Sequence, residues 1–149
     1  MIANIKNYKF KIRNCEDKDY GFVYTLSKKN MYALFVKHWG EWNPKVFKDN
    51  FHKKNIRIVE YGAKRVAFFD FEFKDNFSYI HNVQVSTSMQ GKGLGTFLMY
   101  LMERDTKKYK LRKIRLKVFK DNIARKLYLK LGYKQIKDAG SAVILEKKL

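Results

Sequence analysis

A single cysteine, a single proline and the absence of any long apolar run limit what this chain can be. Cys15 cannot form a disulfide within the chain, and no cluster of Cys and His has the spacing of a zinc site, so no metal is expected. No apolar run approaches the roughly 20 residues of a membrane-spanning helix, and residues 1–14 lack the apolar core of a signal peptide. We therefore expect a cytoplasmic protein without a membrane partner.

Acidic residues are also scarce, since 14 Asp and Glu stand against 33 Lys and Arg, for a formal net charge of +19. Such a surface attracts nucleic acid, acidic proteins and phosphorylated cofactors alike. The abundance of Lys, Asn, Ile, Phe and Tyr is explained as well by AT-rich coding, so the charge alone does not identify a function. No nucleic-acid-binding motif accompanies the charge, and the basic residues are spread over predicted strands and helices, so nucleic acid is not an expected partner.

The length of 149 residues and the hydrophobic content of 46% predict one domain, over residues 1–149, with a single core. Alternating apolar residues predict strands over residues 8–13, 56–61, 65–73, 79–85, 112–118 and 141–148. Helical spacing predicts helical regions over residues 19–29, 31–54 (broken at Gly40), 94–102 and 124–131. The order βααβββαβαβ predicts an α/β fold with a mixed central sheet flanked by helices.

The stretch MQGKGLG, residues 89–95, places three glycines at alternate positions between a predicted strand and a predicted helix. A P-loop is excluded because Gly91-Lys92 is followed by Gly93 instead of Ser or Thr. A dinucleotide fingerprint is disfavoured because Thr96 stands where the third glycine belongs. Two interpretations remain, which are a phosphate site at a helix N-terminus and a tight turn without a ligand.

Two segments at a defined separation carry a more specific pattern. Gln90-x-x-Gly93-x-Gly95 is followed about thirty residues later by NIARKLYLKLGYKQI, residues 122–136. Together they resemble the Q/R-x-x-G-x-G/A signature and the later N-x-x-A-x-x-x-Y-x-x-x-G-[FY] stretch of the GNAT superfamily, with slightly different spacing in the second. The resemblance is clear over residues 79–136 and extends to the N-terminal part only in element order. It implies a GNAT-like fold and an acyltransferase that moves the acetyl group of acetyl-CoA, its co-substrate, to a primary amine.

The resemblance also implies where acetyl-CoA binds. The pyrophosphate would lie against the loop formed by Gln90, Gly91, Lys92, Gly93, Leu94, Gly95 and Thr96. Lys92 either adds a positive charge there or is an ordinary solvated lysine. The strand before the loop would pair with the pantetheine arm through Val83 and Val85, and the Val85 amide would polarise the thioester carbonyl. Asn122 would lie beside the same arm, and it also suits the N-cap of its helix.

Catalytic candidates follow from the same resemblance. Tyr128 would be the general acid for the departing CoA thiolate, although its place on an apolar helix face is also typical of a core aromatic. His81 stands where family members often carry a glutamate, and its chemistry suits a general base, but it could equally be a packed strand residue. Glu72 on the preceding strand is the second candidate for the base, and a chain of water molecules is the third.

The acceptor is the least defined part of the prediction. Residues 106–137 hold thirteen Lys and Arg against one acid, Asp121, which disfavours polycationic acceptors at long range. We expect a small-molecule amine, a protein N-terminus or a lysine as the acceptor, and the sequence leaves a homodimer open. The alternative functions are a CoA-binding sensor or interaction module without catalysis and a basic nucleic-acid-binding protein.

Overall fold

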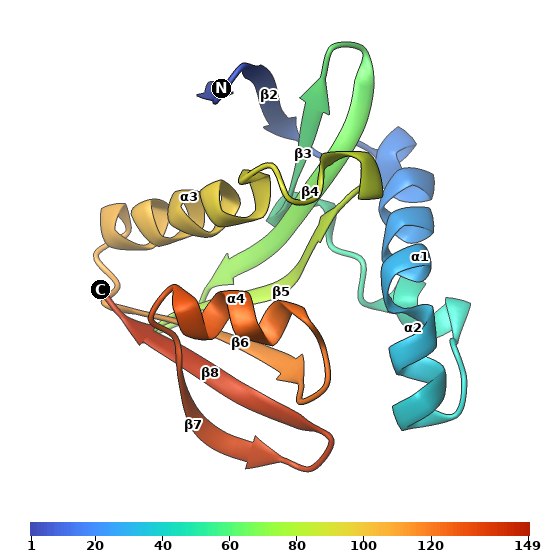
Figure 1. Ribbon diagram of the computed structural model, residues 1–149, viewed down its shortest axis with the longest axis vertical. Helices are drawn as coiled ribbons and strands as arrows, with labels where there is room; N and C mark the ends of the chain where they lie inside the picture. The colour runs from blue at the N-terminus through green and yellow to red at the C-terminus, as the bar shows by residue number, and fades with distance from the viewer. The chain divides into compact units, whose positions relative to one another are not determined.

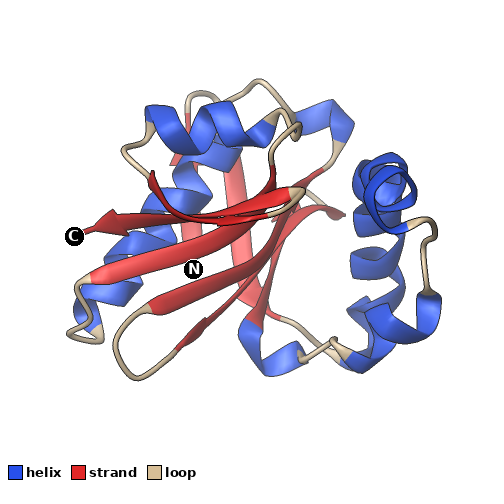
Figure 2. Cartoon of the chain, turned by 90° about the horizontal axis from the view of Figure 1, so that it is seen from below, coloured by secondary structure: helices blue, strands red, loops and turns tan.

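The computed structural model describes residues 1–149, and its eight strands form a mixed sheet in the order β1-β2-β3-β4-β5-β6-β8-β7 (Figure 1). The strands are β1 (Ile2–Ile5), β2 (Tyr8–Asn14), β3 (Ile56–Tyr61), β4 (Lys64–Phe73), β5 (Ser78–Val85), β6 (Lys113–Phe119), β7 (Lys134–Ala139) and β8 (Ala142–Lys148). The helices are α1 (Tyr20–Trp39), α2 (Pro44–Asp49), α3 (Leu94–Lys108) and α4 (Ala124–Lys130). The predicted α/β fold with a mixed sheet and flanking helices is confirmed (Figure 2).

The chain divides into two compact units, which are described separately. The first comprises residues 1–70 and 82–95, and the second comprises residues 71–81 and 96–149. In the first unit β2 pairs antiparallel with β1 and β3, and β3 pairs antiparallel with β4. In the second unit β5 pairs parallel with β6, and β8 pairs antiparallel with β6 and β7.

Two strands and one helix differ from the sequence-based expectation. The two edge strands of the sheet, β1 and β7, are not predicted by the sequence patterns. Strand β7 is exposed along nearly its whole length. Its sequence, KQIKDA, has no apolar alternation from which a strand can be predicted. Its register against β8 also shifts between Gln135 and Lys137. The helical regions 19–29 and 31–39 form one helix, α1, because no glycine or proline separates them. This helix ends at Gly40, whose φ of 84° is the left-handed conformation typical of a helix C-terminus.

The core of the first unit forms where α1 lies on the sheet. Val23 and Leu26 of α1 are buried together with Ile56 and Ile58 of β3 and with Phe68 of β4. Each such side chain stabilises the fold by about 1.5–3 kcal/mol on complete burial. The apolar face of α1 therefore fixes which of its residues lie over the sheet.

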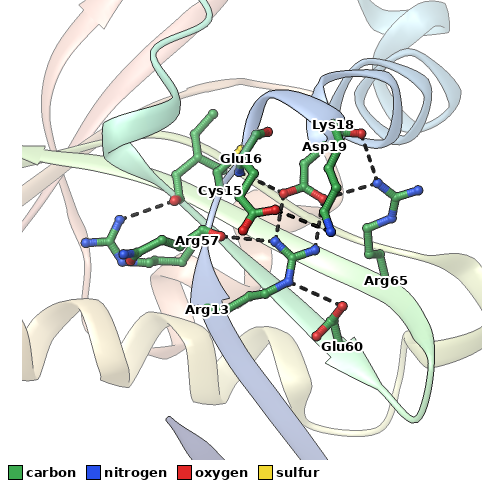
Figure 3. Close-up of polar contacts among 10 residues, drawn as sticks. Arg13, Cys15, Glu16, Lys18, Asp19, Arg57, Glu60 and Arg65 are labelled. Atoms are coloured by element: carbon green, nitrogen blue, oxygen red, sulfur yellow. Dashed lines mark hydrogen bonds and ion pairs between the residues drawn. The ribbon is translucent and has the colours of Figure 1, made fainter.

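An ion-pair cluster around the buried Asp19 holds the start of α1 against the sheet (Figure 3). The carboxylate of Asp19 has no solvent exposure and accepts two hydrogen bonds from Arg13, at 2.7 and 2.9 Å. It also accepts hydrogen bonds from Arg65 Nη1 at 3.1 Å and from the backbone amide of Glu16 at 2.8 Å. The guanidinium of Arg13 thereby holds the pKa of Asp19 well below its usual range. Since Arg13 lies on β2 and Arg65 on β4, the cluster joins both strands to the helix start.

The second unit has its own core, and polar groups are buried in it. Thr106 Oγ1 on α3 lies 2.7 Å from Ser78 Oγ at the start of β5, and both residues are fully buried. The hydroxyl of Tyr133 donates to Glu103 of α3 at 3.0 Å, and Lys147 of β8 donates to the same carboxylate at 2.8 Å. These bonds satisfy the buried polar groups and fix α3 and residue 133 relative to β5 and β8.

Candidate functional site

The glycine stretch connects the end of β5 to the start of α3. After β5 come a short 3₁₀ turn, Thr87–Met89, and a tight turn that ends where α3 begins at Leu94. Gly91 and Gly93 have φ angles of 74° and 88°, which only glycine adopts readily. The first turn of α3 leaves its backbone amides without acceptors inside the helix. The local arrangement is therefore the strand, exposed loop and helix N-terminus that suits a phosphate group.

Two side chains of this loop fold back onto the protein. Gln90 Nε2 donates to the backbone oxygen of Val85 at 2.9 Å, and Lys92 Nζ lies 5.5 Å from the centre of the Tyr8 ring. The side chain of Ile5 approaches the same loop, since a Cβ atom at Gly93 would lie 3.8 Å from Ile5 Cγ2. Neither β1 nor Tyr8 was expected near the loop, because contacts between distant segments leave no trace in local sequence periodicity.

Val85 is the last residue of β5 before the loop, and its backbone amide and carbonyl differ in their hydrogen bonds. The amide of the next residue, Ser86, donates to Val66 on β4 at 2.8 Å. Because successive amides of an extended strand point to opposite sides, the amide of Val85 points away from β4. Its carbonyl, on that same side, accepts hydrogen bonds from Asn30 at 3.2 Å and from Gln90 at 2.9 Å. Val83 lies two residues before Val85, so its amide and carbonyl point to the same side of the strand as those of Val85.

Asn122 and Tyr128 both belong to the α4 region of the second unit. Asn122 Oδ1 accepts a hydrogen bond at 2.9 Å from the amide of Ala124, the first residue of α4. Tyr128 is half-buried, and burial raises the pKa of its phenol to about 12. Its ring centre lies 6.2 Å from that of the fully buried Tyr133. Tyr128 therefore keeps its proton throughout the neutral range and is available there as a hydrogen-bond or proton donor.

The two side-chain candidates for a general base lie next to each other. His81 Nε2 is 2.7 Å from Glu72 Oε1, and Lys74 Nζ is 2.9 Å from the same oxygen. The ammonium of Lys74 and then the His81 ring lower the pKa of the Glu72 carboxyl. The ring of Tyr79 lies 4.9 Å from the His81 ring, between ring centres. His81 is exposed, so it is not the packed strand residue considered from the sequence.

Residues 20–133 match the acetyltransferase (GNAT) family. The chain belongs to this family. It is therefore an acetyl-CoA-dependent N-acetyltransferase, as the glycine loop and the α4 segment had implied. No three of its His, Cys, Asp and Glu side chains gather into a group that could hold a metal ion. No helix is long and apolar enough to cross a membrane.

Solved structures from several organisms share the fold of this acetyltransferase. The PaiA N-acetyltransferase of Thermoplasma acidophilum, in complex with coenzyme A, is 16% identical over 94% of this chain and 99% of its own, with a TM-score of 0.77. The ribosomal-protein-S18-alanine N-acetyltransferase of Escherichia coli is 20% identical over 93% of both chains, with a TM-score of 0.72. An Arabidopsis thaliana protein in complex with the bisubstrate analogue CoA-Ac-MVNAL is 18% identical over 94% of this chain and 99% of its own, with a TM-score of 0.69.

The residues around the loop fit the phosphate and thioester groups of acetyl-CoA. A Cβ atom at Gly91 would meet no heavy atom within 4 Å, so the space over this left-handed glycine is open to a ligand. Because the side chain of Leu94 is buried, only its backbone amide is available to a ligand at the start of α3. The Val85 amide, a few residues earlier in the chain, points away from β4 and is a hydrogen-bond donor of the kind that a carbonyl oxygen accepts.

Proposed function

We propose that this acetyltransferase catalyses direct attack of a primary amine on the thioester carbonyl of acetyl-CoA, without an acetylated enzyme intermediate. The arrangement at Val85 carries the proposal, because its amide points away from β4 immediately before a loop suited to phosphate. The family match spans residues 20–133 and includes parts of both compact units. We therefore propose that residues 1–149 act as one N-acetyltransferase domain.

Acetyl-CoA would be held by backbone groups more than by side chains. The amides of residues 90–96 would bind the pyrophosphate, helped by the positive end of α3. Val83 and Val85 would pair with the pantetheine arm as an edge strand does, and Asn122 would lie beside the same arm. Since Lys92 rests on Tyr8, its charge would act on the phosphates at a distance. Bound acetyl-CoA supplies an activated acyl group with a thiolate leaving group.

The acceptor amine must lose a proton to attack, and His81 is the proposed base. The 2.7 Å contact with Glu72 orients the His81 ring for this role. The negative charge that develops on the carbonyl oxygen would be stabilised by the Val85 amide. Tyr128 would then protonate the departing sulfur, since its raised pKa keeps the phenol protonated at neutral pH. The proton taken by His81 then passes through solvent to the Tyr128 phenolate, which restores both groups.

The acceptor is proposed as a small-molecule amine, a protein N-terminus or a lysine. Among the similar structures, one is a ribosomal-protein-S18-alanine N-acetyltransferase and another holds the bisubstrate analogue CoA-Ac-MVNAL. Both are under 25% identical to this chain. The excess of basic residues over 106–137 disfavours polyamines and other polycations as acceptors.

The decisive experiment combines cofactor binding with thiol release. Acetyl-CoA at 100 times its Kd should stabilise the fold by about 2.7 kcal/mol and raise Tm, whereas NAD and ATP should not. Release of CoA thiol is then measured against a panel of amines, amino acids and peptides. Stabilisation without thiol release from any acceptor would favour a CoA-binding module without catalysis. No shift of Tm at millimolar acetyl-CoA would contradict the proposed function.

A further inference from the structure

We propose that Asn30 on α1 is a positioning residue for acetyl transfer, which acts by occupying the carbonyl of Val85 together with Gln90. The inference rests on the proposed function of the Val85 amide, and it assigns a role to a helix that carries no motif. A carbonyl oxygen has two lone pairs. Val85 uses both, since Asn30 Nδ2 donates at 3.2 Å and Gln90 Nε2 donates at 2.9 Å.

As a result, Val85 presents a hydrogen-bond donor to a ligand, while its acceptor is already occupied. The amide and the carbonyl of an extended residue point to the same side of its strand. With the carbonyl satisfied by two side chains, the amide is the one polar group of Val85 left to meet a ligand there. A thioester oxygen accepts hydrogen bonds and cannot donate them, so it fits this edge. The two donors also offset the partial negative charge of the Val85 carbonyl, which would otherwise oppose the negative charge developing on a nearby oxygen.

Asn30 itself is held in place by a chain of neutral hydrogen bonds. Asn30 Nδ2 also donates to Gln84 Oε1 at 3.0 Å, and Gln84 Nε2 donates to Asn82 Oδ1 at 2.8 Å. The chain ends where Asn82 Nδ2 donates to the buried hydroxyl of Ser27 at 3.1 Å. Such a chain fixes the amide orientation of Gln84 and Asn82, because the oxygen and the nitrogen of each have a partner, and Asn30 Nδ2 is held by two acceptors.

The periodicities of the two elements explain why these residues meet. Ser27 and Asn30 are three residues apart on α1 and so share one face of the helix. Asn82 and Gln84 are two residues apart on β5 and so share one face of the strand. No charged side chain takes part, so the position of the Val85 carbonyl does not depend on pH in the working range.

The test replaces Asn30 by its acidic isostere. In Asn30→Asp the donor becomes a carboxylate that repels the Val85 oxygen. We expect kcat to fall about tenfold, less than the 10²–10³-fold cost of losing an oxyanion donor itself, while the Kd of acetyl-CoA changes less than about threefold. The ratio of variant to wild-type kcat should recover as pH falls, because the protonated carboxyl can donate again. Lys29→Gln, an exposed neighbour with the same change of net charge, should retain wild-type kcat.

Asn30→Ala and a spectroscopic measurement separate positioning from folding. In ¹³C-labelled full-length protein, the Val85 carbonyl resonance should move in Asn30→Ala because one of its two donors is gone. An unmoved resonance, or an unchanged kcat in Asn30→Asp, would overturn the proposal. So would parallel losses of Tm, cofactor affinity and kcat, since these indicate a merely structural role. If the wild-type protein releases no thiol with any amine, the proposed function fails, and the resonance still decides whether Asn30 holds the carbonyl.

Discussion

His81 Nε2 and Glu72 Oε1 lie 2.7 Å apart. This contact joins the histidine of β5 to the residue of β4 that is the other side-chain candidate for the general base. A carboxylate at one ring nitrogen orients the imidazole and sets which nitrogen carries the proton. The pair is therefore proposed to work as one unit, with His81 as the group that meets the amine.

Replacing His81 by Gln should lower kcat/KM for the amine by about 10²-fold, because a general base is lost. Glu72→Gln should lower it by a smaller factor, since the ring remains but loses its charged partner. Steady-state kinetics at several pH values measures both. His52→Gln, which removes an exposed histidine on another part of the chain, is the control and should keep full activity. Unchanged kinetics in His81→Gln would point instead to proton transfer through water.

Tyr128→Phe should lower kcat by about 10²-fold and leave the Kd of acetyl-CoA nearly unchanged, because only the departing thiolate needs the phenol proton. Since burial raises the pKa of Tyr128 to about 12, activity should not decline near pH 10, where an exposed tyrosine ionises. Tyr109→Phe, which removes an exposed hydroxyl, is the matched control. A wild-type kcat in Tyr128→Phe would exclude the phenol as the acid.

The same raised pKa has a consequence for stability. The folded state holds the Tyr128 proton more tightly than the unfolded chain, whose tyrosines titrate near ~10. Its contribution is therefore complete below about pH 10 and is lost as the pH rises towards the folded pKa of about 12. Urea unfolding at pH 8 and pH 11 should show a smaller loss of stability in Tyr128→Phe than in the wild-type protein.

Gly93→Ala should abolish acetyl-CoA binding, measured by the loss of the cofactor-induced rise in Tm. The substitution also forces an alanine to φ near 88°, which costs about 1–2 kcal/mol of folding stability. Gly140→Ala is the matched control, because Gly140 has a similar φ of 82° in the turn between β7 and β8. Both variants should lose similar stability, and only Gly93→Ala should lose the cofactor. Retained binding in Gly93→Ala would exclude the loop as the pyrophosphate site.

Asp19→Asn should destabilise the fold by about 3 kcal/mol, because it removes the charge that pairs with Arg13 and Arg65. Asp49→Asn removes an exposed partner of Lys45 and should cost less than about 0.5 kcal/mol. Because Arg13 lowers the pKa of Asp19, the contribution of this carboxylate is present above the unfolded pKa of about 4 and is lost as the pH falls further. Equal stabilities of the two variants in urea would contradict this assignment.

Local sequence patterns predicted most of the fold because most elements have one buried face. Alternation identified β2, β3, β4, β5, β6 and β8, and the break at Gly40 was located correctly. The strands β1 and β7 escaped prediction because β1 is four residues long and β7 is exposed. For such edge strands, pairing with a neighbour decides the structure, and burial leaves no pattern in the sequence.

The family and its co-substrate were determined by the sequence alone, since the loop from Gln90 to Gly95 and the later segment with Tyr128 follow in the order, and at about the separation, of the family's two motifs. Contacts between segments far apart in the chain were decided only by the tertiary structure. Asn30 reaches the Val85 carbonyl across 55 positions, and Lys92 lies over Tyr8. Hydrogen bonds and ring contacts of this kind depend on which faces of a helix and a strand are packed together. That choice is made by burial of the whole core, so no short motif encodes it.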